Sequence, residues 1–235
     1  MKYFGTLLLA LVCLVATGQT RLPVDSVIAT KHTTTIKGQT INYTAYKGTQ
    51  PVWDDAGKAI ASLDYTFYER DGITDKASRP LVISFNGGPG SASVWMQIAY
   101  TGPTLINIDD EGYPVQPYGY KKNPYSILDV ADIIFINPVN TGYSRILDDK
   151  VSKSTFFGIN ADIRYLAEWI NNFVTRQSRW SSPKYLIGES YGTTRVSGLA
   201  HELQNNHWMY LNGVVLVSPT DLGIKRDGPV GTALR

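Results

Sequence analysis

Cysteine is almost absent from this chain, since Cys13 is the only one among 235 residues. A single thiol cannot close an intramolecular disulfide, so a small fold stapled by disulfides is excluded. The three histidines have no metal-ligand spacing and no dinucleotide fingerprint is present, so no metal or other cofactor is expected. An excess of charge of one sign is also lacking, because 22 basic and 20 acidic residues leave a net charge of only +2. That balance gives no reason to expect nucleic acid or an anionic membrane as a partner.

The longest apolar run lies at the N-terminus. Residues 1–18 combine the basic Lys2, a mainly apolar run over residues 4–15 and small residues up to Gly18, a pattern typical of a secretory signal peptide. The run is too short to span a bilayer comfortably, and Cys13 lacks the small preceding residue of a lipoprotein cleavage box. We therefore expect export with cleavage near Gly18 and no membrane contact afterwards. A mature chain without cysteine fits a bacterial periplasmic or secreted protein.

Residues 19–235 are expected to form one domain, which at this length buries roughly two-thirds of its unfolded surface. Residues 33–69 tend to alternate apolar and polar side chains, which predicts an antiparallel meander with a turn at Lys47-Gly48. The pattern then changes to continuous apolar runs, typical of buried parallel strands, and to helical spacing. Strands are predicted over residues 80–85, 132–136, 184–187 and 213–217, helices over 157–176 and 193–204, and a loop at the active-site edge over 102–126. The order predicts an α/β fold with a mixed, mostly parallel sheet.

A G-x-S-x-G pentapeptide, Gly188-Glu189-Ser190-Tyr191-Gly192, lies between a predicted strand and a predicted helix. The pentapeptide alone is weak evidence, but strand, turn and helix are the context of a nucleophile elbow. In such an elbow the glycines leave room for a strained backbone, and the serine Oγ is exposed above the sheet. Ser190 is therefore the candidate nucleophile.

A glycine-rich loop, Asn86-Gly87-Gly88-Pro89-Gly90, follows an earlier predicted strand. Attack on an acyl carbon develops negative charge on the carbonyl oxygen, which preorganised backbone N–H groups stabilise. Two donors are expected, the N–H of Tyr191 and the N–H of Gly88, with Gly87 allowing close approach of the backbone. The alternative is a tight turn that only closes the preceding strand.

Four segments occur in the order found in one known family: residues 86–93, Gly102-Pro103, residues 137–144 and the elbow. On these segments the chain resembles the serine carboxypeptidase family, in its bacterial branch, over about residues 81–220. The resemblance implies an α/β-hydrolase fold. It also implies an enzyme that releases C-terminal residues from peptides through an acyl-enzyme.

The resemblance further implies that Asn86 and Glu189, with Gly87 beside them, bind a substrate's terminal carboxylate. Asn86 can donate through its amide, whereas Glu189 can donate only when protonated, so we expect better substrate binding at acid pH. The alternative for Glu189 is an elbow residue that merely packs. Ser84 and Ser91 replace a tryptophan and a cysteine that the family often carries, which predicts a looser or altered carboxylate site.

A serine nucleophile needs a base, and in this fold the acid and then the histidine follow the serine. His201 is eleven residues along the elbow helix, roughly 16 Å away, and His207 is farther still, so both are expected to be surface or helix-end residues. His32 has no motif around it, and Asp221 is a weak candidate for the acid. We expect the catalytic Asp and His beyond Arg235, in a C-terminal part that this chain lacks. The chain alone is then expected to catalyse poorly or not at all.

Two other interpretations remain open. A prolyl iminopeptidase, esterase or acyltransferase would use the same loop and elbow but not the pair of Asn86 and Glu189. A non-catalytic, truncated protein that binds peptide is the third interpretation. The residue preference at the cleaved end and the oligomeric state are not indicated by the sequence.

Overall fold

The computed structural model describes residues 22–219. The predicted signal peptide over residues 1–18 and the candidate acid Asp221 lie outside the described residues. No helix in the described part is long and apolar enough to cross a membrane.

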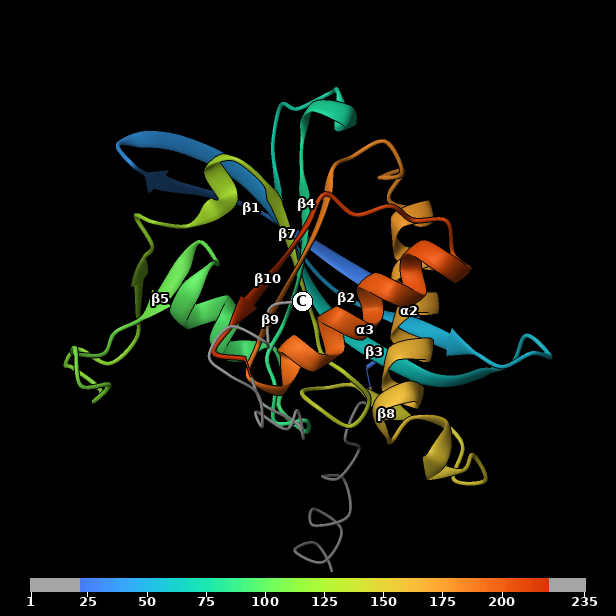
Figure 1. The fold of residues 1–235 in the computed structure, drawn as a ribbon. Helices are drawn as coiled ribbons and strands as arrows, with labels where there is room; N and C mark the ends of the chain where they lie inside the picture. Colours follow the sequence, from blue (N-terminus) through green and yellow to red (C-terminus); the bar gives the residue numbers. More distant parts are fainter. Residues whose placement is uncertain (1–21, 220–235) are drawn as a thin grey trace, which may run out of the picture.

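A mixed sheet forms the centre of the molecule (Figure 1). Its strands are β1 (Ser26–Ile36), β2 (Gln39–Trp53), β3 (Ala59–Arg70), β4 (Leu81–Phe85), β7 (Asp132–Ile136), β8 (Arg145–Ile146), β9 (Lys184–Glu189) and β10 (Gly213–Val217). The order is β1-β2-β3-β7-β4-β9-β10, with β8 paired to β3. The pairs from β1 to β7 are antiparallel, and β7, β4, β9 and β10 run parallel. The predicted mixed sheet with an N-terminal meander is confirmed.

The meander turns at a different place from the one predicted. β1 and β2 are joined at Lys37-Gly38, where both residues have positive φ, as in the two-residue turns that suit twisted hairpins. The turn expected at Lys47-Gly48 is wrong, because β2 continues through both residues. A Cβ at Gly48 would lie 2.7 Å from the Tyr65 ring and 2.9 Å from the Ser26 carbonyl oxygen. This glycine therefore serves close packing inside the sheet rather than a turn.

Two helices cover one face of the sheet, α2 (Ile159–Arg176) and α3 (Tyr191–Asn206), which lie side by side in Figure 1. Both predicted helices are confirmed, with α2 beginning after Gly158 (φ +119). Trp169 of α2 is buried and exchanges two hydrogen bonds of 3.0 Å with the side chain and carbonyl oxygen of Gln50 on β2. These bonds satisfy polar groups that the packing of α2 against the sheet has removed from water.

The other face carries short elements. They are a π-turn η2 (Met96–Tyr100) and a hairpin of β5 (Thr104–Ile106) and β6 (Tyr120–Lys122). Three 3-10 turns each precede a longer element: η1 (Lys76–Ser78) before β4, η3 (Ile127–Asp129) before β7 and η4 (Lys153–Thr155) before α2. The prediction of a plain loop over residues 102–126 is therefore wrong in part. Strands of three residues are too short to show an alternating pattern, so periodicity could not reveal this hairpin.

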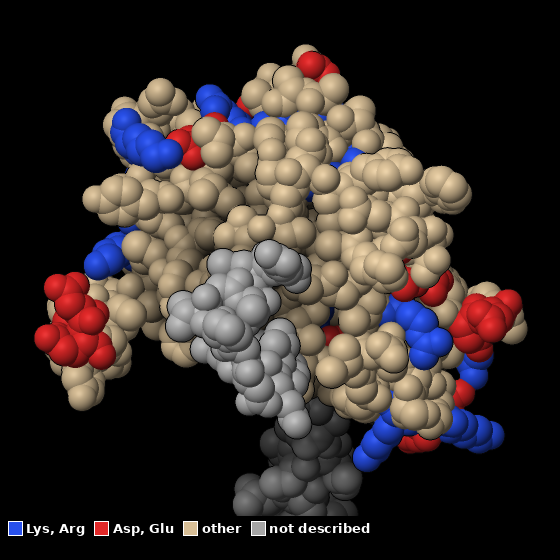
Figure 2. Space-filling view, viewed as in Figure 1, with Lys and Arg blue, Asp and Glu red and all other residues tan. Residues whose placement is uncertain are grey.

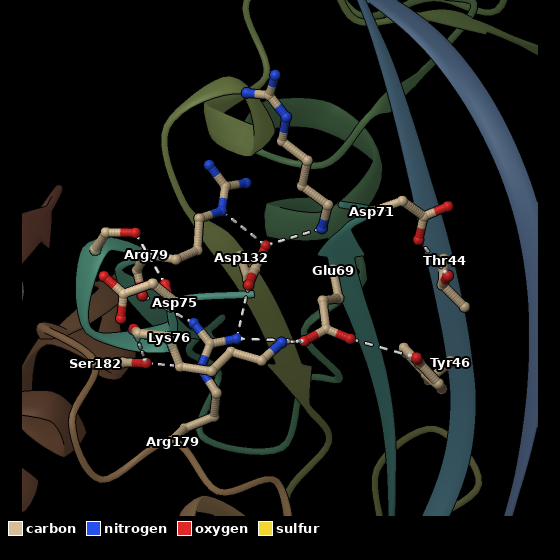
Figure 3. Close-up of polar contacts among 12 residues, drawn as sticks. Thr44, Tyr46, Glu69, Asp71, Asp75, Lys76, Arg79, Asp132, Arg179 and Ser182 are labelled. Carbon is tan, nitrogen blue, oxygen red and sulfur yellow. Dashed lines mark hydrogen bonds and ion pairs between the residues drawn. The ribbon is translucent and has the colours of Figure 1, made fainter. Parts of the chain in front are cut away.

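A buried ion network lies at the amino ends of β4, β7 and β9, opposite the elbow (Figure 3). Asp132 accepts hydrogen bonds from Arg79 Nε at 3.0 Å, Arg179 Nη1 at 2.6 Å and the N–H of Arg70 at 2.9 Å. Burial lowers the pKa of the Arg79 guanidinium, and the Asp132 carboxylate opposes that shift. Each buried charge in this network therefore has a hydrogen-bonded counter-charge.

β10 forms one border of the sheet. Among residues 22–219 it pairs with β9 on one side only, and Val214, Val215 and Leu216 are between 38% and 47% exposed. Figure 2 shows the molecule from the same side as Figure 1, and on this side charged residues gather around the rim and are sparse towards the middle. The border strand is thus apolar and largely uncovered by the described residues.

Candidate active site

The predicted elbow is a sharp turn between β9 and α3. Ser190 has φ +56 and ψ −125, a conformation that costs a non-glycine residue strain. Its N–H donates to the Val217 carbonyl oxygen at 3.0 Å, which ties the turn to the end of β10. A Cβ at Gly188 would lie 2.2 Å from the Gly192 carbonyl oxygen, so a glycine is needed there for the chain to turn this tightly. A Cβ at Gly192 would lie 3.1 Å from the carbonyl oxygens of Phe85 and Asn86, so this glycine lets α3 pack closely against the end of β4.

The glycine-rich loop lies directly against the elbow. A Cβ at Gly87 would be 2.5 Å from the Tyr191 nitrogen and 2.9 Å from the Ser190 Cβ. The next residue, Gly88, has φ +108, which favours glycine. The structure therefore brings the loop and Ser190 together, as the sequence predicted.

The two predicted donors are the N–H groups of Gly88 and Tyr191. Tyr191 is the first residue of α3, and the first N–H groups of a helix have no acceptor within that helix. The described residues show no hydrogen bond from the Gly88 N–H. The positive end of the helix dipole adds to the preference for negative charge here. The arrangement suits an oxyanion, although the roles of these groups stay predictions.

Asn86 and Glu189 are also brought together. The Met96 N–H donates to Asn86 Oδ1 at 2.9 Å, so the amide nitrogen faces Glu189, where Nδ2 donates to Oε2 at 3.1 Å. Asn86 is buried and Glu189 is partly exposed. Each group therefore keeps capacity for a ligand, since Nδ2 has a second hydrogen and the carboxylate a second oxygen.

Residues 137–144, one of the segments that carried the resemblance, support the loop. Asn137 Oδ1 accepts from the Ser93 N–H at 2.9 Å, and Nδ2 donates to Asp64 Oδ2 at 2.7 Å. The Ser93 hydroxyl donates to the Ile136 carbonyl oxygen at 2.5 Å. These bonds fasten the segment after the glycine-rich loop to the end of β7 and to the middle of β3.

Arg195 is a further residue at this site that the sequence analysis passed over. It is 1% exposed, and its guanidinium donates to the carbonyl oxygens of Asn86 at 2.9 Å and Pro89 at 3.4 Å. Its Nε donates to Asp162 Oδ2 at 2.8 Å. A signal was present, because Tyr191, Arg195 and the buried Leu199 follow one another at helical spacing of four.

A cavity of about 330 Å³ opens beside the elbow. Much of its wall is apolar and comes from Val139, Phe156, Phe157, Ile159 and Tyr165, with the Tyr191 side chain at one border. Burial and the neighbouring Asp162 raise the pKa of the Tyr191 phenol, so it stays protonated at neutral pH. The cavity lies on the α2 and α3 face, whereas Asn86 turns its side chain towards Met96 on the other face. The two features therefore flank Ser190 from opposite sides.

The three histidines lie elsewhere in the described part. His32 on β1 stacks on Tyr43 with ring centroids 5.3 Å apart. His201 is exposed and hydrogen-bonded to Asn205 on α3, and His207 follows the end of that helix. No group of His, Cys, Asp and Glu within residues 22–219 could hold a metal ion.

A family model described as serine carboxypeptidase matches residues 37–220. The chain belongs to the serine carboxypeptidase family. The matched span holds the glycine-rich loop, the Asn137 segment and the elbow, so the predicted family is confirmed. The predicted bacterial branch is not confirmed, because the relatives described below come from Arabidopsis thaliana and Dictyostelium discoideum.

Several family members are similar over part of their length. Serine carboxypeptidase-like 31 of Arabidopsis thaliana is 28% identical over 86% of this chain and 40% of its own. Serine carboxypeptidase S10 family member 1 of Dictyostelium discoideum is 27% identical over 56% of this chain and 29% of its own. The chain thus spans about two-fifths or less of the curated relatives that it matches.

A solved structure shares the fold. It is Kex1(delta)p of Saccharomyces cerevisiae, described as a prohormone-processing carboxypeptidase, with a TM-score of 0.60 and 19% identity. The alignment covers 74% of this chain and 38% of Kex1. The predicted α/β-hydrolase fold is confirmed by this neighbour together with the strand order.

Proposed function

We propose that this protein is a serine-type carboxypeptidase that releases C-terminal residues from peptides. The observation that carries the proposal is the convergence of three features at one point. Ser190 sits on a strained elbow, the glycine-rich loop packs against it at Gly87, and the pair of Asn86 and Glu189 lies on one side. The relatives' names and the family support the same activity, which belongs to a protein longer than the described part.

In the proposed reaction the Ser190 oxygen attacks the carbonyl carbon of the last peptide bond. Negative charge then develops on the carbonyl oxygen, where the N–H groups of Gly88 and Tyr191 stabilise it. The C–N bond breaks, the amine of the terminal residue leaves with a proton, and water later hydrolyses the acyl-enzyme. We propose that the general base comes from a part of the protein outside the described residues.

The pair of Asn86 and Glu189 and the apolar cavity, on opposite sides of Ser190, determine how the proposed peptide substrate is oriented. Its terminal carboxylate lies against Asn86 Nδ2 and a protonated Glu189, on the η2 side. The side chain of the preceding residue then lies towards the apolar cavity on the α2 side. Export through residues 1–18, to a periplasm or the medium, is part of the same proposal.

The test compares an N-blocked dipeptide with a free C-terminal carboxylate against its C-terminal amide, using the full-length protein. We expect kcat/KM to be about 10- to 100-fold higher for the acid, because a charge-assisted hydrogen bond is worth roughly 1.5–3 kcal/mol. KM for the acid should fall as the pH is lowered, since Glu189 must be protonated to donate.

Two variants serve as controls for this prediction. Ser190→Ala should abolish turnover of both peptides, and Glu189→Gln should remove the dependence of KM on pH because the amide donates at every pH. Equal turnover of acid and amide would mean a different hydrolase, such as an esterase or an iminopeptidase. If KM of the Glu189→Gln variant equals that of the wild type at every pH, Glu189 only packs and does not bind the carboxylate.

A further inference from the structure

Arg195 is buried one helical turn beyond the first residue of α3 and forms hydrogen bonds with two residues of the glycine-rich loop. Its Nη1 donates to the Asn86 carbonyl oxygen at 2.9 Å and its Nη2 to the Pro89 carbonyl oxygen at 3.4 Å. These two carbonyl groups flank Gly88 in the chain. Since Arg195 lies on the helix that begins with Tyr191, one side chain joins the segments that carry both N–H donors.

The guanidinium is itself held from three directions. Nε donates to Asp162 on α2 at 2.8 Å, and Asp162 also accepts from the Tyr165 hydroxyl at 3.2 Å. The guanidinium carbon lies 5.4 Å from the ring centre of Phe85 and 5.2 Å from that of Tyr191. The Asp162 charge balances the buried cation, so the effect of Arg195 on the loop is mainly geometric.

The loop needs such a support because its glycines have little conformational preference of their own. The Gly87 carbonyl oxygen accepts from the Ser91 N–H at 3.2 Å. Since a trans peptide unit is planar, the Gly88 N–H of the same unit points the opposite way. Arg195 bonds the Asn86 carbonyl before this unit and the Pro89 carbonyl after it, which restricts the positions that the loop around Gly88 can take.

We propose that Arg195 is a positioning residue that sets the direction and separation of the Gly88 and Tyr191 N–H groups. The proposal rests on the proposed function, because it takes these two groups as the oxyanion hole. A hole misplaced by about 1 Å loses on the order of 100-fold in rate, so a support of this kind affects chemistry without touching the substrate.

The test uses the full-length protein and measures the labelling of Ser190 by a fluorophosphonate, in which negative charge develops on the phosphonyl oxygen. Arg195→Met keeps roughly the side-chain volume and removes the guanidinium with its N–H donors. Arg195→Lys keeps the positive charge, and Arg195→Ala leaves space in which added methylguanidinium can bind. Arg179→Met is the matched control, because Arg179 is equally buried and pairs with Asp132 at the far end of the sheet. Unfolding midpoints and amide exchange of residues 86–91 are measured on every variant.

We expect the limiting labelling rate of Arg195→Met to fall about 10- to 100-fold per folded molecule, with little change in the half-saturating probe concentration. Arg195→Lys should be intermediate, and methylguanidinium should restore part of the rate in Arg195→Ala. Arg179→Met should label like wild type even where it unfolds more easily. Residues 86–91 should exchange faster in Arg195→Met than in Arg179→Met.

Equal labelling and equal exchange in Arg195→Met and Arg179→Met would overturn the proposal, as would no effect in Arg195→Met. A wild-type protein that is not labelled at Ser190 would contradict the proposed function instead. In that case the amide hydrogen exchange of residues 86–91 still tests the role of Arg195, because Arg195→Met, unlike Arg179→Met, should make these residues exchange faster.

Discussion

At the scale of single residues, the absence of a side chain at Gly87 matters most for the site. The Gly87 backbone packs against Tyr191 and Ser190 at distances that exclude a Cβ. Gly90, three residues later in the same loop, has open space around it. The two glycines therefore differ in function although both belong to the same short motif.

Gly87→Ala should push the loop away from the elbow and slow Ser190 labelling by about 100-fold or more, because small misplacements at the reacting centre cost about that much. Gly90→Ala should label like wild type. Labelling rates corrected for folded fraction check both expectations. Similar rates for the two variants would mean that the loop relaxes without loss of function.

The motif residues of the site could be predicted from the sequence because each lies in a short local pattern, as Ser190 does between its glycines. For Arg195 the helical spacing indicates only that it shares a face of α3 with Tyr191 and Leu199, and its contact to the loop could not be predicted, since Arg195 and Asn86 are 109 positions apart. A charged side chain is also assigned to the surface by default, because arginine is rarely buried without a partner. Its partner, Asp162, comes from a different helix that no local pattern links to the elbow.

At the scale of elements, the two border strands of the described sheet differ. β1 carries Lys31, a charged side chain that discourages pairing with another chain. β10 instead presents Val214, Val215 and Leu216 without charged neighbours in the strand. An exposed apolar border of this kind favours association with another strand or surface.

We expect Val215→Lys to lower self-association of the chain and its binding of a hydrophobic dye. Val27→Lys on β1, where Val27 is also exposed, should change both properties less. Analytical ultracentrifugation and dye fluorescence at equal protein concentration measure the difference. Equal effects of the two lysines would mean that net charge, rather than the β10 border, controls association.

The strands and helices of the β/α part could be predicted because each is long enough to show its period. Continuous apolar runs gave β4, β7, β9 and β10 nearly to their ends. The meander was harder, since a lysine and a glycine favour a turn at Lys47-Gly48 as much as at Lys37-Gly38. Only packing against Tyr65 across the sheet distinguishes the two, and that contact is not local.

At the scale of the whole molecule, the two ends of the parallel strands have different tasks. The carboxyl ends hold glycines, backbone donors and the elbow, whereas the amino ends hold the ion network around Asp132. Removing one partner of a buried ion pair leaves the other charge without compensation in a medium of low polarity. Stability and chemistry should therefore respond to substitutions at opposite ends of the sheet.

Asp132→Asn should lower the free energy of unfolding by about 3–5 kcal/mol, since Arg79 loses its counter-charge and Arg179 keeps only Glu69, at 3.6 Å. Asp148→Asn, which breaks the exposed pair of Asp148 with Lys58, should change it little. Urea titration gives both values. The folded fraction of Asp132→Asn should still be labelled at Ser190 at the wild-type rate, and a slower rate would mean that the two ends are coupled.

The stacking of Arg195 on Tyr191 also has a consequence for the neighbouring cavity. Tyr191 forms part of its wall, and that ring is held by the Arg195 guanidinium stacked on its face and by Asp162 near its hydroxyl. A clamped wall is already ordered before anything enters, so little conformational entropy remains to be lost on binding. The cavity should therefore discriminate by shape and size, admitting side chains that fit and excluding larger ones rather than reshaping around them.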